Sequence, residues 1–123
     1  MPQRLLTFVL LSLACATGAG DASALGFGRA QPSAVLGQPL DFSVPVRIEA
    51  GEVLPSACVS AEVAVGDAVL PRSSVGASLE SVAGVASIRV RTQSNIEEPV
   101  VSVTVTVGCD GQVSRRFTLF ADP

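Results

Sequence analysis

The chain has 123 residues, a length that suits one domain and leaves little room for a second. It carries 11 acidic and 8 basic residues, and the basic residues, all arginines, are scattered along the chain. This distribution argues against a nucleic-acid-binding face and against a polybasic membrane patch. Histidine is absent, which excludes a Ser-His-Asp or Cys-His triad and every histidine-containing metal site. We therefore expect no cofactor, no metal site and no nucleic-acid partner.

Residues 1–24 have the pattern of a cleavable secretory signal. A short start that contains Arg4 is followed by an apolar run at residues 5–14. As a helix this run would be about 15 Å long, roughly half the thickness of a bilayer's hydrocarbon core. That length fits the hydrophobic region of a signal peptide and is too short for a membrane anchor.

The cleavage site is predicted from the small residues that the signal peptidase requires. Ala22 and Ala24 stand at the third and the last position before the cut, so we predict that the mature protein begins at Leu25. A lipoprotein reading is the alternative and would make Cys15 the lipidated first residue. Against it, Ser12 stands where a lipobox normally has leucine.

The expected exported domain comprises residues 25–123 and has no second apolar run near twenty residues, so we expect no membrane span in it. It keeps Cys58 and Cys109, and an even pair of cysteines in an oxidising compartment is usually a disulfide. Two free buried thiols are the alternative. Signal and cysteines together predict an exported protein.

Residues 40–48 alternate between apolar and polar side chains, which predicts a half-buried strand. Pro45 lies in the middle of the polar side and lacks the N–H that a ladder needs, so we expect an edge strand or a bulge here. An exposed edge is a ready site for strand addition by another chain. The residues expected to contact a partner are those of the polar side, Asp41, Ser43, Arg47 and Glu49.

Similar alternation predicts further strands at residues 59–65, 88–91, 101–107 and 113–121. Between the first two of them, residues 66–84 combine Pro71 with many small residues. This composition indicates a loop with short strands or one helical turn.

An Asp-Gly step between the last two strands is a hairpin signal. We expect a three-residue loop at residues 110–112, because a two-residue turn would set the apolar face of one strand against the polar face of the other. The three-residue loop pairs Val105 with Phe117 and Val103 with Leu119.

These features predict one all-β domain, a small Ig-like or Greek-key β-sandwich of about six to eight strands. The chain has 19 valines and no long helical period. It has 5 phenylalanines but no tryptophan or tyrosine, so valine and alanine must fill the core. A core of small side chains makes the expected disulfide important for stability.

Two adjacent charged pairs are the candidates for chemistry. Glu97-Glu98 precedes Pro99 at a strand entrance, where solvated acids are ordinary, and a tryptophan or tyrosine platform for a sugar is missing. Arg115-Arg116 could contact an anion, but a charged pair on an exposed strand is the simpler interpretation. Neither pair forms a catalytic constellation, and we predict that the protein is not an enzyme.

Several short stretches carry a family resemblance. Residues 25–28 (LGFG) look like an "LGLG" opening, and residues 33–40 (SAVLGQPL) are similar to an "S-x-L-G-Q-P-L" segment. Residues 98–100 (EPV) and 115–123 (RRFTLFADP) look like an "EPF … R-E-Y-T-L-L-x-D-P" close. In this order they resemble the N-terminal periplasmic domain of the FimV family, proteins of type IV pilus assembly and cell-pole organisation.

The resemblance implies a non-catalytic periplasmic interaction or assembly module, whose partners are envelope proteins such as the type IV pilus machinery. The chain departs from the family in lacking its tryptophan before the last hairpin, near which Cys109 stands. Peptidoglycan binding belongs to a LysM module that follows in family members, so it is not carried over. The alternative is a secreted or surface β-sandwich subunit, pilin-like or adhesin-like, that polymerises by strand exchange.

Overall fold

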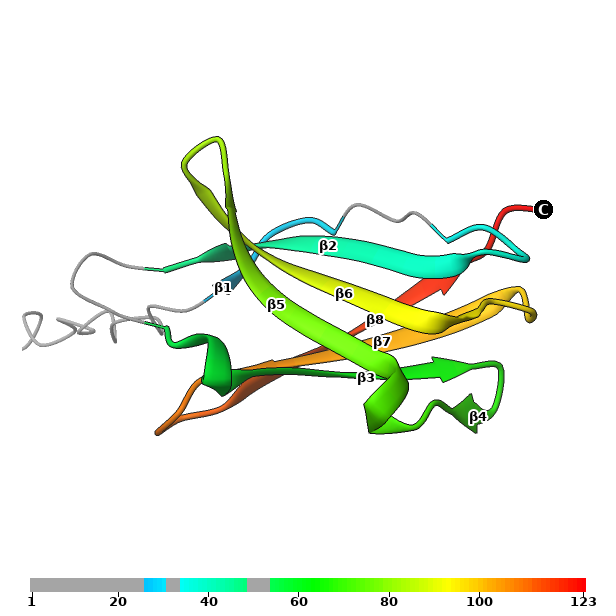
Figure 1. The fold of residues 1–123 in the computed structure, drawn as a ribbon. Helices are drawn as coiled ribbons and strands as arrows, with labels where there is room; N and C mark the ends of the chain where they lie inside the picture. The colour runs from blue at the N-terminus through cyan, green and yellow to red at the C-terminus, as the bar shows by residue number, and fades with distance from the viewer. Residues whose placement is uncertain (1–25, 31–33, 49–53) are drawn as a thin grey trace, which may run out of the picture.

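The computed structural model describes residues 26–30, 34–48 and 54–123. The expected signal peptide and Glu49 lie outside the described residues. The described part forms two four-stranded sheets that face one another, with each pair of neighbouring strands antiparallel (Figure 1). The predicted all-β sandwich is therefore confirmed.

The first sheet, here called the β2–β6 sheet, has the strand order β1-β2-β6-β5. Its strands are β1 (Gly26–Phe27), β2 (Pro39–Arg47), β5 (Val75–Val82) and β6 (Val85–Asn95). The second, the β3–β7 sheet, has the order β4-β3-β7-β8. It contains β3 (Val59–Val65), β4 (Ala68–Val69), β7 (Val100–Val107) and β8 (Val113–Phe120). The first, second, fifth and sixth strands thus share one sheet, as in an immunoglobulin-like sandwich.

The core lies between the two sheets and consists mainly of valine. One inner strand of each sheet supplies four of its members: Leu40, Phe42, Val44 and Val46 of β2 and Val101, Val103, Val105 and Val107 of β7. The ring of Phe117 on β8 lies 5.2 Å from that of Phe42 and 6.1 Å from that of Phe27 on β1. These three rings close the sandwich on the side of β1 and β8.

Strand β2 carries Pro45 although β1 and β6 flank it in the sheet. The carbonyl of Pro45 accepts a hydrogen bond from the N–H of Gly28 at 2.8 Å, so the proline nitrogen also faces β1 and removes no donor from the β6 ladder. Of the two alternatives expected for this strand, an edge position or a bulge, the edge position is not found, because β1 lies beside β2. In the register, β1 pairs only with Val46 and Arg47. A shift in the β2–β6 ladder does occur, between Pro39 and Asp41.

The segment of residues 66–84 is more regular than its composition indicates. It contains β4, the 3₁₀ turn η3 (Arg72–Ser74) and the eight-residue strand β5, and β6 extends beyond the predicted residues 88–91 at both ends. The tight turn at Ala83 and Gly84, which both have positive φ, joins β5 to β6 in one long hairpin. Tertiary pairing along β6 thus overrides the weak strand propensity of the small residues.

Strands β7 and β8 pair in a register that differs from the predicted one by two residues. Phe117 lies opposite Val103 instead of Val105, and the loop covers residues 108–112 instead of 110–112. An even shift keeps the same side chains on the inner face, so the expected burial of the apolar side is confirmed while the expected pairing is wrong.

The disulfide between Cys58 and Cys109 lies just beyond the end of β7. Cys58 ends the 3₁₀ turn η2 (Ser56–Cys58) just before β3, and Cys109 follows β7, with 5.1 Å between the two Cα atoms. Gly108 turns the chain out of the ladder with a φ of 113° and donates its N–H to the carbonyl of Cys58 at 3.0 Å. The predicted bond is confirmed and joins the ends of neighbouring strands in one sheet.

Candidate functional site

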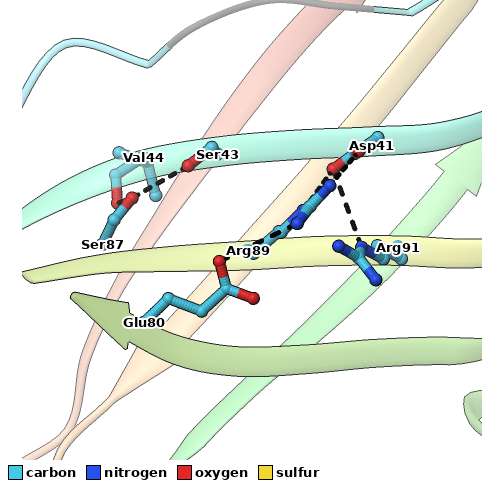
Figure 2. Close-up of polar contacts among 7 residues, drawn as sticks. All are labelled: Asp41, Ser43, Val44, Glu80, Ser87, Arg89 and Arg91. Atoms are coloured by element: carbon cyan, nitrogen blue, oxygen red, sulfur yellow. Dashed lines mark hydrogen bonds and ion pairs between the residues drawn. The ribbon is translucent and has the colours of Figure 1, made fainter. Parts of the chain in front are cut away.

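The polar side of β2 lies on the outer face of the β2–β6 sheet beside the polar side of β6. The carboxylate of Asp41 accepts two hydrogen bonds from the guanidinium of Arg89, at 2.8 and 2.5 Å (Figure 2). The Arg89 side chain also lies 3.9 Å from the carboxylate of Glu80 on β5, and Arg91 lies 3.9 Å from Asp41. These two acids and two arginines are called the outer cluster below.

Charge in the outer cluster is balanced across three strands. The hydrogen bonds from Arg89, together with the positive charges of Arg89 and Arg91, hold the pKa of Asp41 below its usual value, against a smaller opposing effect of burial. The same bonds to Asp41 raise the pKa of Arg89. A forked guanidinium–carboxylate contact fixes direction as well as charge. The cluster therefore ties β2, β6 and β5 together.

A second polar contact lies further along the same two strands. The hydroxyls of Ser43 and Ser87 are 2.8 Å apart, and Ser87 donates to the carbonyl of Val44 at 3.2 Å (Figure 2). Ser87 has a single hydroxyl proton, so Ser43 must be the donor between the two serines. The hydroxyls of both serines therefore form hydrogen bonds between β2 and β6.

The four residues expected to contact a partner do not share one environment in the fold. Asp41 and Ser43 contact β6 through the interactions above. Arg47 is exposed and lies opposite Gly26 of β1, and Glu49 lies outside the described residues. The structure thus brings Asp41 and Ser43 into contact with their own sheet, while Arg47 lies beside β1. Their contact with a partner remains a prediction.

The two adjacent charged pairs lie at different places. Glu97 and Glu98 are exposed in the loop between β6 and β7. Arg115 and Arg116 are exposed on β8, the last strand of the β3–β7 sheet. Within the described ranges, no three or more His, Cys, Asp or Glu residues lie where they could hold a metal ion together. None of the helices in the part of the chain that the structure describes has the length and apolar character needed to cross a bilayer.

Strand β8 is an edge that the sequence pattern does not reveal. The N–H of Ala121 donates to the carbonyl of Pro99 in the β7 direction, so the odd-numbered residues of β8 face β7. The N–H and C=O groups of the even-numbered residues therefore face the other way, and no described strand pairs with them over Ser114–Phe120. The alternation of residues 113–121 would fit an inner strand equally well, so the sequence pattern does not distinguish this edge.

Apolar side chains gather at one end of the outer face of the same sheet. Phe120 is 74% exposed, and Val100, its register partner on β7, is 39% exposed. Val69 of β4 is 60% exposed and pairs with Ala64 of β3, whose side chain lies on the same face. Among the large apolar side chains of the described residues, Phe120 is the most exposed.

Three of the four stretches that carry the family resemblance meet at this end of the sandwich, whereas Gly26 and Phe27 of the first stretch pair with Arg47 and Val46 at the other end of β2. Residues 34–36 run parallel to the end of the chain: Asp122 donates to the carbonyl of Ala34 at 2.9 Å and accepts from the N–H of Leu36 at 2.7 Å. Gly37 and Gln38 exchange backbone hydrogen bonds with Ile96, just before the Glu-Glu-Pro loop. Segments far apart in sequence thus form one hydrogen-bonded end, where the cyan, orange and red parts of the chain meet (Figure 1).

Comparisons of the chain with protein-family models, with curated proteins and with solved structures give no match.

Proposed function

We propose that the chain is a non-catalytic periplasmic interaction or assembly module, resembling the FimV N-terminal domain and related to type IV pilus assembly or envelope organisation. The observation that carries the proposal is the meeting of residues 34–38, 96–100 and 120–122 in one end of the fold. Each motif alone is short. Backbone hydrogen bonds between the motifs support the view that they act together as one part of the fold.

Export is supported by two independent features. The leader pattern of residues 1–24 provides a signal, and the bond between Cys58 and Cys109 suits an oxidising compartment. We expect protein recovered from the periplasm to begin at Leu25. Measurement of its intact mass tests this, and a diacylated species that begins at Cys15 or an uncleaved chain in the periplasmic fraction would contradict it.

The proposed role is tested in cells. Deletion of the gene is expected to lower pilus number and twitching motility, and expression of the parent chain is expected to restore both. The matched control restores the chain without its leader, because the same domain left in the cytoplasm should not rescue. Unchanged pili and motility in the deletion strain would remove the pilus link.

The alternative role, a subunit that polymerises by strand exchange, is addressed by the oligomeric state. In the described residues β8 already occupies the place beside β7, so a donor strand would have to add outside it. The assembly module is expected to sediment as a species of fixed size at all concentrations. A ladder of growing polymers would favour the alternative.

A further inference from the structure

We propose that the open edge of β8 binds an extended acidic segment of a partner protein, which adds as a further strand to the β3–β7 sheet. The inference rests on the proposed function only in taking the domain to work by presenting a surface. It places the partner on β8 instead of on β2, where the sequence pattern placed it.

The backbone of β8 is ready for strand addition. The outward groups of Ser114, Arg116, Thr118 and Phe120 have no strand partner among the described residues. Further along the same edge, Asp122 already exchanges two hydrogen bonds with residues 34–36 in a parallel bridge. The chain itself therefore uses this edge to hold an extended segment, as it would hold an incoming strand.

The charge of the edge selects an acidic partner. Arg89 and Arg91 on β6 each have a carboxylate within 4 Å, whereas no described acid forms an ion pair with Arg115 or Arg116. Arg115 lies with its guanidinium carbon 5.1 Å from the centre of the Phe117 ring, and Arg116 reaches only the hydroxyl of Ser102 at 3.4 Å. Arg115 and Arg116, adjacent on an open strand, thus form no ion pair with an acid in the part of the chain that the structure describes.

The two arginines lie on opposite faces of the sheet. Side chains of neighbouring residues alternate along a strand, so Arg115 belongs to the inner side and Arg116 to the outer side. Two adjacent carboxylates on an added strand would alternate in the same way and each meet one arginine. Phe120, four residues beyond Arg116 and on the same outer face, would contact an apolar residue at the matching position.

If the edge of β8 were only protected against aggregation, Arg115 and Arg116 would be explained but the exposed Phe120 would not. Charged residues on an outermost strand discourage pairing between copies. An exposed aromatic side chain at the end of the same strand works in the opposite sense, because it favours contact. Charge and apolar surface together define a selective edge that rejects another copy and accepts a complementary strand.

The test uses the full chain, recovered after export, and a synthetic peptide of alternating threonine and valine with two adjacent glutamates. Amide hydrogen exchange is measured with and without the peptide. Arg116 and Thr118 are expected to exchange quickly in the free protein and slowly in the complex, whereas Phe117 and Leu119 are protected in both by β7. Fast exchange that the peptide leaves unchanged, or protection of Thr118 in the free protein, would overturn the proposal.

Substitutions in β8 distinguish the contribution of the arginine charges to peptide binding from that of backbone hydrogen bonds. Arg115→Gln and Arg116→Gln are each expected to weaken binding by about tenfold, and a peptide with glutamines in place of glutamates should lose binding similarly. Thr118→Pro removes one outward N–H and should abolish binding while the protein stays folded, and Thr118→Ala should bind like the parent. Arg72→Gln, the same charge change on an exposed residue of η3, is the control.

The remaining outcomes are also decisive. Binding that survives Thr118→Pro would mean simple charge attraction and would overturn strand addition. A dimer of the parent that dissociates on the same substitution would mean that a second copy is the occupant. The peptide assay is independent of the cell phenotype, so loss of the pilus link would leave this inference standing, and failure of peptide binding would leave the pilus link untouched.

Discussion

The two sheets of this sandwich stabilise their outer surfaces in different ways. On the β2–β6 sheet, arginines of β6 are paired with Asp41 and Glu80 of flanking strands. On the β3–β7 sheet, a disulfide joins the strand ends and the arginines of β8 have no acidic partner among the described residues. Arginines therefore hold strands together in the β2–β6 sheet, whereas the arginines of β8 remain available to contact another molecule. The difference arises from the side chains that the neighbouring strands present.

The largest effect on stability is expected from removing the disulfide of the β3–β7 sheet. Replacing Cys58 and Cys109 together with alanine should lower the free energy of unfolding by about 4 kcal/mol, because the bond closes a long loop between cysteines 51 positions apart. Against a total stability of about 5–15 kcal/mol this is a large share. Denaturant unfolding of parent and variant measures the difference. Equal midpoints would show that the β3–β7 sheet does not depend on its disulfide.

A smaller loss is expected from the turn that brings Cys109 to its partner. Gly108 has a φ of 113°, and a β-carbon there would approach the carbonyl oxygen of Gly111 to 2.1 Å. Gly108→Ala should therefore destabilise the protein by about 3 kcal/mol. Gly111→Ala is the matched control, because a β-carbon there meets nothing within 4 Å. Thermal unfolding of both variants should separate them clearly, and similar melting temperatures would contradict this account of the turn.

The ion pairs of the opposite sheet should contribute less. Asp41→Asn is expected to lower the free energy of unfolding by about 1 kcal/mol at most, since the Asp41 side chain is half exposed. Arg116→Gln, which breaks no ion pair in the described structure, should leave stability unchanged. Denaturant unfolding at low salt gives both values. A larger loss from Arg116→Gln than from Asp41→Asn would reverse the comparison between the sheets.

The smallest effect is a dependence on pH. Because the pKa of Asp41 is lowered in the folded protein, its contribution to stability is present above the unfolded value of about 3.9 and is lost as pH falls through the folded pKa. The difference in unfolding free energy between parent and Asp41→Asn should therefore shrink below about pH 4. Unfolding midpoints measured across this range test it. A difference that stays constant to the lowest pH would exclude the ion pair as its source.

Much of the fold follows from local pattern. Alternation at residues 40–48, 59–65 and 101–107 predicts both the strands and their buried faces, because the side-chain period of a strand is two. The pairing of Cys58 with Cys109 was predicted because they are the two cysteines that remain once residues 1–24 are removed. The segment that became β5 escaped prediction because its small residues have little strand preference until β6 lies beside them.

What the sequence determined by itself is which side of each strand faces inward. It left open which strands are neighbours, because a period of two is unchanged when a strand moves to another place in the sheet or shifts by two residues. The β7–β8 register and the position of β2 were decided in the tertiary structure, by the disulfide beyond β7 and by Gly28 beside Pro45. For the same reason the open edge of β8 is visible only in three dimensions, since an edge is defined by the absence of a neighbour and not by the residues that form it.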